Sequence, residues 1–185
     1  RAAEELRTEL AAGADPHTAP VTVEVVYTAA HEAWSSGCAI ATVSIDRDTG
    51  ELHIHGLIWV DDVGLVINPR LVQGQLLGGL AQGLGQILCE QIHYDADGQL
   101  LTGSLMDYAI LRADQMPAVE LHSCATRTDA NALGAKGVGE SGCIVAPALI
   151  FNAALDALRP LGITDLPMPL TSKNLWHAMQ RVPGS

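Results

Sequence analysis

The sequence contains few aromatic and few basic residues. Aromatic side chains make up 4% of its 185 residues, and only ten lysines and arginines accompany 21 aspartates and glutamates. The net charge of −11 argues against nucleic-acid binding, which needs basic patches to neutralise phosphates. Hydrophobic residues make up 48% of the chain, which also has 18 glycines, so we expect an aliphatic core with close backbone packing in one domain or two small ones.

Closely spaced cysteine pairs are also absent. Cys38, Cys89, Cys124 and Cys143 lie far apart, which predicts free, buried thiols in a reducing, cytoplasmic compartment and no zinc or iron–sulfur site within this chain. No run of about 18 uncharged apolar residues is present, so we expect no membrane span. The chain begins without an initiator methionine or a signal peptide, which suggests a fragment or a processed subunit.

Hydrophobic periodicity predicts an α+β fold, in which mixed or antiparallel hairpins pack with a long glycine-rich helix and with a helix that follows a central loop. We expect an N-terminal helix and linker over residues 1–20, followed by a domain over residues 21–185. Strands are expected over residues 21–27 and 119–125, hairpins over residues 38–60 and 93–102, and a last helix after Thr171, with Leu170 and Leu175 as a hydrophobic staple.

The first hairpin is expected to turn at residues 46–50. Strict alternation in its second arm places four apolar side chains on one face: Leu52, Ile54, Ile58 and Val60. The opposite face would carry His53, His55, Leu57 and Trp59. Two histidines on one face could bind a metal. Because no third ligand is nearby, a half-exposed strand face is the simpler interpretation.

The glycine-rich helix is expected to begin at Asn68, a good N-cap, with Pro69 in the first turn, and to run to about residue 91. Its apolar stripe has the spacing i, i+4 and consists of Val72, Leu76, Leu80, Leu84 and Leu88. Its glycines each cost about 1 kcal/mol relative to alanine. They are Gly74, Gly78, Gly79, Gly83 and Gly85. Close packing against another backbone or a ligand would compensate this cost.

The central loop, residues 134–142, reads Gly-Ala-Lys-Gly-Val-Gly-Glu-Ser-Gly. Its glycines let the backbone approach a ligand closely, so Glu140 is a candidate catalytic base beside a bound cofactor. Alternatively, Glu140 is an acid favoured by the dipole of the following helix. The buried side of that helix, which we expect to end near residue 158, is predicted to comprise Ile144, Ala148, Phe151 or Leu155, and Leu158.

Residues 137–142 also match the dinucleotide fingerprint G-x-G-x-x-G. That fingerprint needs a buried strand immediately before it, whereas residues 126–132 are polar. The acidic residue at about the required distance, Asp156, falls inside the predicted helix. An unrelated nucleotide-binding protein is therefore a weaker alternative.

Five ordered segments of the chain together resemble the carboxy-terminal part of the large subunit of molybdenum hydroxylases, the family of xanthine dehydrogenase, aldehyde oxidoreductase and carbon monoxide dehydrogenase. The segments are residues 60–69, 73–83, 97–108, 133–142 and 165–171. The resemblance extends over residues 38–180 and is strongest to the carbon-monoxide-dehydrogenase-like subunits. Val63 stands where the family has cysteine, and Ala132 where it has proline.

The resemblance implies a molybdenum cofactor held by molybdopterin, in its cytosine dinucleotide form. Glu140 would be the base that takes a proton from a hydroxide ligand of molybdenum, for hydroxylation of an electron-poor carbon in an aldehyde, an N-heterocycle or carbon monoxide. Gln75 would bind the pterin, or else be a polar residue on an exposed helix face. Further contacts to the cofactor are implied for Asp62, Asn68, Lys136, Gly137, Val138 and Gly139, although capping and turn chemistry would also explain Asp62 and Asn68.

The resemblance also implies partners, because this chain has no ligands for the electron carriers. Electrons would leave through an iron–sulfur small subunit and an FAD-containing medium subunit, and the remainder of the large subunit would complete the cofactor shell. We expect a dimer of this assembly. The alternative within the same fold is a non-catalytic assembly subunit.

Overall fold

The computed structural model describes residues 2–13, 24, 26–28 and 31–181, and the chain forms two compact units, residues 1–32 and 33–185. The first unit contains α1 (Ala2–Ala11), which confirms the predicted N-terminal helix. The strand predicted over residues 21–27 is not formed at residues 24, 26 and 27, and the rest of it lies outside the described residues. The boundary predicted at residue 20 also falls there.

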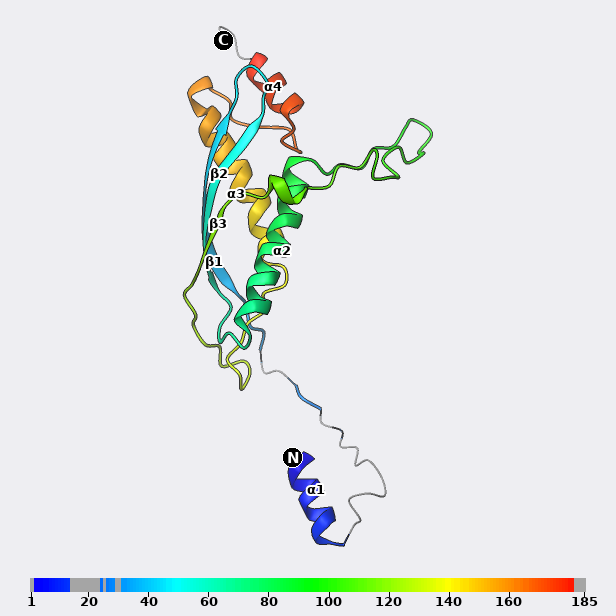
Figure 1. The fold of residues 1–185 in the computed structure, drawn as a ribbon, viewed down its shortest axis with the longest axis vertical. Helices are drawn as coiled ribbons and strands as arrows, with labels where there is room; N and C mark the ends of the chain where they lie inside the picture. The colour runs from blue at the N-terminus through cyan, green and yellow to red at the C-terminus, as the bar shows by residue number, and fades with distance from the viewer. Residues whose placement is uncertain (1, 14–23, 25, 29–30, 182–185) are drawn as a thin grey trace. The chain divides into compact units, whose positions relative to one another are not determined.

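A three-stranded sheet forms one layer of the second unit (Figure 1). β1 (Ser36–Ile45) pairs antiparallel with β2 (Leu52–Asp62), and β3 (Val119–Ser123) lies parallel to β2 on its other side. The turn between β1 and β2 is closed by Asp46, whose carboxylate accepts hydrogen bonds from the backbone N–H groups of Asp48 and Thr49. The predicted hairpin and the predicted strand near residue 119 are therefore confirmed.

A β-bulge in β2 makes the predicted face of its second half wrong. Thr42 pairs with Gly56 and Val43 pairs with Ile54, so that His55 is left as the extra residue. An extra residue shifts the side-chain alternation by one position. Leu57 and Trp59 are consequently buried in the core together with the half-buried Leu52 and Ile54, whereas Ile58 faces out.

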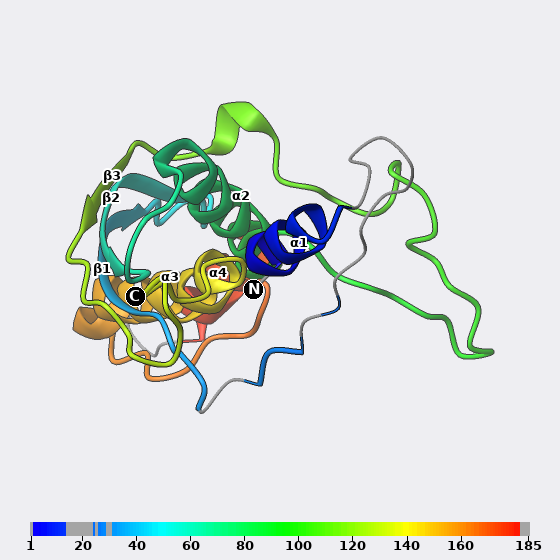
Figure 2. The same cartoon turned by 90° about the horizontal axis from the view of Figure 1, so that it is seen from below.

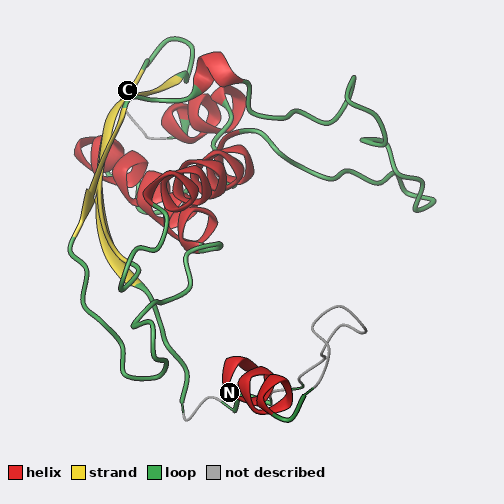
Figure 3. Ribbon diagram, turned by 60° about the horizontal axis from the view of Figure 1, so that its bottom comes forward, coloured by secondary structure: helices red, strands yellow, loops and turns green. Residues whose placement is uncertain are grey.

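Two long helices cover one face of this sheet (Figures 1 and 3). α2 (Pro69–Leu88) begins at its predicted N-cap, since the Asn68 side chain accepts from the backbone N–H groups of Arg70 and Leu71. α3 (Ser141–Leu158) follows the central loop and packs on both α2 and β1. Seen along the sheet, α2 lies nearer to β3 and α3 nearer to β1 (Figure 2).

The buried stripe of α3 differs from the predicted one. Its buried residues are Gly142, Ala146, Ile150, Ala154 and Leu158, of which Leu158 was predicted. Phe151 and Leu155 are half-buried against the core, whereas Ile144 and Ala148 are exposed. Gly142 and Ala146 face α2 because the two helices pack closely there, with the Cβ position of Gly83 only 2.8 Å from the Ala146 Cβ atom. Apolarity alone does not indicate such a contact.

Residues Ser141–Leu161 are also long and apolar enough to cross a membrane by length and composition. The sequence criterion of an uncharged run did not identify this segment, because it contains Asp156 and Arg159. The regular spacing of the buried residues is that of a helix packed against a core.

The core lies between the sheet and the helices. Its buried members are Leu57, Trp59, Leu76, Leu80, Leu84, Ile87, Ala146, Ile150, Ala154, Leu158, Leu166, Leu170, Leu175 and Met179. The last helix, α4 (Ser172–Gln180), is capped by Thr171, and its predicted staple residues Leu170 and Leu175 are both buried, as expected. All four cysteines are free thiols, as predicted, but the prediction that they are buried is wrong, because Cys38 and Cys124 are exposed and Cys89 and Cys143 are half-buried.

The second predicted hairpin is formed only in part. Residues 93–102 contain a single bridge between Tyr94 and Leu100, and they belong to an extended arm that leaves the end of α2 (Figure 1). The Tyr108 hydroxyl, near the end of the arm, donates a hydrogen bond of 2.6 Å to the carboxylate of Glu90, which lies at its start.

Candidate functional site

The first half of the central loop is fixed to the end of β2 by backbone hydrogen bonds. The N–H group of Lys136 donates to the carbonyl of Val63 at 2.8 Å, and that of Leu65 donates to the carbonyl of Gly134 at 2.8 Å. Gly64 and Gly134 have φ of +67° and +72°, and a Cβ atom on Gly64 would lie 2.4 Å from the Gly134 oxygen. Glycine is therefore required where these two segments meet.

Asn131 holds the same turn from within the loop. Its side-chain oxygen accepts from the N–H groups of Gly134 and Ala135 at 2.9 and 3.2 Å, and its amide nitrogen donates to the Ala135 carbonyl at 2.8 Å. The sequence analysis did not select Asn131. An asparagine three residues before a glycine is a signal of turn chemistry and could have identified it.

A charged cluster below the loop joins three separate segments. The Lys136 ammonium lies 2.8 Å from the Asp62 carboxylate and donates at 2.9 Å to the Thr126 hydroxyl. Asp62 also accepts from the Thr126 hydroxyl and from the backbone N–H groups of Thr126 and Gly64. Hydrogen bonds from Lys136 and Thr126 hold the pKa of Asp62 well below its ordinary value. The sequence analysis also missed Thr126.

Replacing Asp62 by asparagine tests this cluster. Because the pKa of Asp62 is lowered by folding, its contribution to stability is present above the unfolded pKa of about 3.9 and is lost as the pH falls towards the native value. We expect Asp62→Asn to lower the urea midpoint of unfolding clearly at pH 7, because Lys136 loses its partner, and to differ less from the parent chain at pH 3.

Asp114→Asn is the matched control for that experiment. Asp114 pairs with Arg112 at 3.1 Å, but both side chains are 70% exposed, so this loss should change the urea midpoint little. Equal shifts for the two variants, or an Asp62→Asn shift that persists unchanged at pH 3, would contradict the account of the cluster.

The second half of the loop is open. Within the described residues, the backbone N–H groups of Gly137, Val138 and Gly139 donate no hydrogen bond, and Glu140 is exposed with no partner for its carboxylate. A pocket of about 470 Å³, here called the loop pocket, lies beside these residues. It is lined by Ala33, Trp34, Ser35, Ser36, Gly37, Trp59, Asp61, Gly137, Val138, Gly139, Glu140, Ser141, Ile144 and Val145.

The contact between α2 and α3 brings Gln75 to this loop. A Cβ atom on Gly142 would lie 2.2 Å from the Leu80 nitrogen, and one on Gly79 would lie 3.2 Å from the Gly142 Cα atom. About one turn before this contact on α2, the Gln75 amide nitrogen lies 3.7 Å from the Cβ position of Gly139. The packing predicted to compensate the helix glycines is thus present at Gly79, although Gly74 and Gly78 face open space in the described structure.

The implied cofactor residues thus lie in three places. Gln75 adjoins the open half of the loop, which contains Gly137, Val138, Gly139 and Glu140. Lys136 and Asp62 bind each other beneath the first half, and Asn68 caps α2. In the described part of the chain no three His, Cys, Asp or Glu side chains group to hold a metal ion. His55 instead bonds to Ser44 at 2.7 Å, and His53 lies 3.7 Å from Glu51.

The run before the loop does not support a dinucleotide fingerprint. Residues 124–132 form no strand, and Asp156 lies inside α3, as the sequence predicts. A Rossmann-type site needs a buried strand leading into the glycine loop, so the alternative of an unrelated nucleotide-binding protein is not supported.

Comparison with known proteins identifies the fold. The crystal structure of quinoline 2-oxidoreductase from Pseudomonas putida 86 superposes with a TM-score of 0.77 at 37% identity, and the match covers 80% of this chain and 19% of that one. The nicotine 6-hydroxylase large subunit of Paenarthrobacter nicotinovorans is 38% identical over 149 residues, which are 80% of this chain and 18% of the relative.

The carbon monoxide dehydrogenase large chain of Hydrogenophaga pseudoflava is 36% identical over 144 residues, 78% of this chain and 18% of the relative. The chain therefore spans about a fifth of the length of the curated relatives it matches. Residues 3–117 match the family described as the molybdopterin cofactor-binding domain. The chain belongs to the molybdopterin cofactor-binding domain family, as found in the large subunits of xanthine dehydrogenase-type molybdenum hydroxylases.

Proposed function

We propose that this chain forms the part of a molybdenum hydroxylase that presents the catalytic base, Glu140, to a molybdenum cofactor in the loop pocket. The reaction is hydroxylation of an electron-poor carbon, in an aldehyde, an N-heterocycle or carbon monoxide. The observation that carries the proposal is the open half of the loop, where a free carboxylate follows three backbone N–H groups that have no acceptor in the described structure.

The residues present fit such a cofactor. The N–H groups of Gly137, Val138 and Gly139, which have no acceptor among the described residues, can donate to the oxygens of a pterin or a phosphate. Gln75 lies beside them with an amide that both donates and accepts. A Cβ atom at Gly137 would meet no atom within 4 Å, so this stretch of backbone is accessible to a ligand.

The chemistry supplied by a bound molybdenum cofactor is a two-electron oxidation in which oxygen derived from water is added to carbon. The Glu140 carboxylate would accept a proton during this reaction, which an exposed and unpaired carboxylate is free to do. The two electrons would leave through iron–sulfur and FAD partner subunits, which would supply the electron carriers. We also propose that the molybdopterin is in its cytosine dinucleotide form and that the protein is cytoplasmic.

Isotope labelling tests the proposed reaction. The natively purified assembly is incubated with an aldehyde, a pyridine-type heterocycle or carbon monoxide, together with an electron-accepting dye, in H₂¹⁸O. We expect ¹⁸O in the product and two electrons delivered to the dye for each product molecule. A molybdenum-loaded assembly that oxidises none of the three classes, or that forms product without the label, would refute it.

Gln75→Leu tests the proposed cofactor contact. Removing the amide beside Gly139 should reduce the pterin retained after purification by about tenfold, the effect of losing one or two hydrogen bonds to a bound ligand. The control is Gln82→Leu, at an exposed position of the same helix, which should retain the parent amount. Pterin released by acid is quantified by fluorescence, and equal retention in both variants would exclude Gln75 from the contact.

A further inference from the structure

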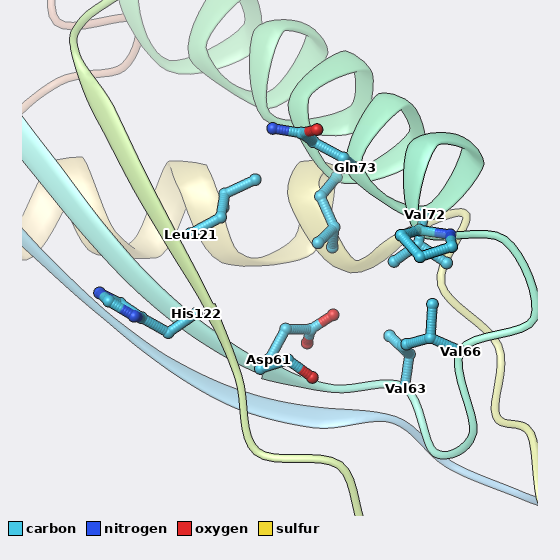
Figure 4. Close-up of a pocket in the computed structure, with 10 residues that line it drawn as sticks. Asp61, Val63, Val66, Val72, Gln73, Leu121 and His122 are labelled. Carbon is cyan, nitrogen blue, oxygen red and sulfur yellow. The ribbon is translucent and has the colours of Figure 1, made fainter.

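A second pocket, here called the Asp61 pocket, lies between the ends of β2 and β3 and the first turns of α2 (Figure 4). Its volume is about 260 Å³, and its walls are largely apolar side chains, including Val66, Val72, Leu76 and Leu121. Among the described residues, Asp61 is the only one that lines both this pocket and the loop pocket. The rest of the two linings is separate, so the Asp61 pocket is not part of the site described above.

One of the two carboxylate oxygens of Asp61 is buried without a partner in the described structure. The residue is 5% exposed, and its Oδ2 atom has no hydrogen-bond partner within the described structure. Figure 4 shows the side chain pointing from β2 towards α2, into the pocket. The terminal torsion of aspartate is soft, so a small rotation can turn either oxygen to a ligand. Burial is the main reason that the pKa of Asp61 is raised.

We propose that the Asp61 pocket binds an ammonium or guanidinium group on an aliphatic stem. A buried carboxylate oxygen without a partner is costly, and a cation that donates a hydrogen bond to it removes that cost. The apolar walls fit the stem. Among the charged or titratable residues of the lining, only His122 accompanies Asp61, and its ring nitrogen lies 2.7 Å from the Glu120 carboxylate. No cation of the lining thus competes for Asp61.

The cation could belong to a free small amine or to a lysine or arginine side chain in segments that the longer relatives have and this chain does not. Both sources share the same chemistry. The proposal goes beyond the proposed hydroxylase reaction, because a cation bound in the Asp61 pocket would be neither the substrate nor the cofactor of that reaction.

Methyl NMR with two probes of similar shape tests the proposal. n-Butylammonium is titrated into this chain at neutral pH, and n-butanol serves as the uncharged control. We expect the methyl signals of Val72, Leu76 and Leu121 to shift saturably as butylammonium is added, with a dissociation constant on the order of 10 mM for so small a ligand. The affinity for butanol should be at least tenfold lower. Asp61→Asn should remove this preference for the charged probe.

Val72→Phe provides a second variant that keeps the carboxylate and fills the pocket, so it should abolish binding of both probes. Equal affinity for the two probes in the parent chain, or an unchanged preference in a folded Asp61→Asn variant, would overturn the proposal. The same titration on the natively purified assembly distinguishes the sources. Loss of butylammonium binding there indicates a side chain that fills the pocket, whereas retained binding indicates a site for a free amine.

Discussion

Glu140→Gln is expected to lower the turnover number of the assembled enzyme by at least about 100-fold, the lower end of what a general base contributes. Glutamine keeps the shape of the side chain but cannot accept the proton. Glu140 has no side-chain partner in the described structure and does not cap α3 with its carboxylate, so the variant should unfold at the same temperature as the parent. Steady-state kinetics with saturating dye measures the change.

The control for Glu140→Gln is Asp48→Asn in the exposed turn between β1 and β2, which removes the same charge far from the loop in sequence. It should leave the turnover number and the retained pterin unchanged. Full activity of a cofactor-loaded Glu140→Gln enzyme would show that another group accepts the proton. Loss of pterin in parallel with activity would instead assign Glu140 to cofactor binding.

Gly142→Ala is expected to have the largest effect on stability. A Cβ atom at this position would lie 2.2 Å from the Leu80 nitrogen and 2.7 Å from the Leu76 carbonyl oxygen, and neither backbone atom can move without displacing α2. Overpacking against side chains costs about 1–3 kcal/mol, and here the obstacle is backbone, so we expect a loss of roughly 3 kcal/mol or more. This corresponds to a fall in Tm of about 6–12 °C.

Gly78→Ala is the matched control on α2. A Cβ atom at Gly78 would meet nothing within 4 Å, and alanine favours the helix over glycine by about 1 kcal/mol. This variant should therefore raise Tm slightly. Thermal unfolding followed by circular dichroism compares the two, and a Gly142→Ala variant as stable as the parent would contradict the close contact of α2 with α3. Because Gln75 and Gly139 adjoin the same contact, Gly142→Ala should also reduce pterin retention.

Local chemistry explains why much of the fold could be predicted from the sequence. Asn68 and Thr171 are side chains that cap helices, and both α2 and α4 begin where they stand. The residues around Gly50 are typical of a turn, and the hairpin forms there. These features depend on a few neighbouring residues, so no tertiary contact is needed to recognise them.

The predictions that were wrong required knowledge of tertiary contacts. The bulge at His55 reverses which side chains of β2 face the core, and nothing in the alternation of residues 52–60 indicates the extra residue. The buried face of α3 is set at the start of the helix by its close approach to α2, where Gly142 and Ala146 are buried and the larger Ile144, which apolarity favours, is exposed.

The candidate site, too, has features that local sequence predicts and features that depend on tertiary contacts. The open loop and Glu140 are recognisable from the glycine spacing and from the resemblance. The ion pair of Asp62 with Lys136 joins residues 74 positions apart. The Asp61 oxygen that has no partner in the described structure can be recognised only when the sheet and α2 are in place. Contacts between distant segments are not encoded in any local pattern.

The most direct test of the central claim is the molybdenum content of the natively purified protein, measured by mass spectrometry together with the identity of every chain that co-purifies. The account predicts about one molybdenum atom for each copy of this chain, accompanied by iron–sulfur and FAD-containing partners. An intact assembly that contains all of those partner chains but no molybdenum would contradict the catalytic proposal and favour a non-catalytic assembly subunit of the same fold.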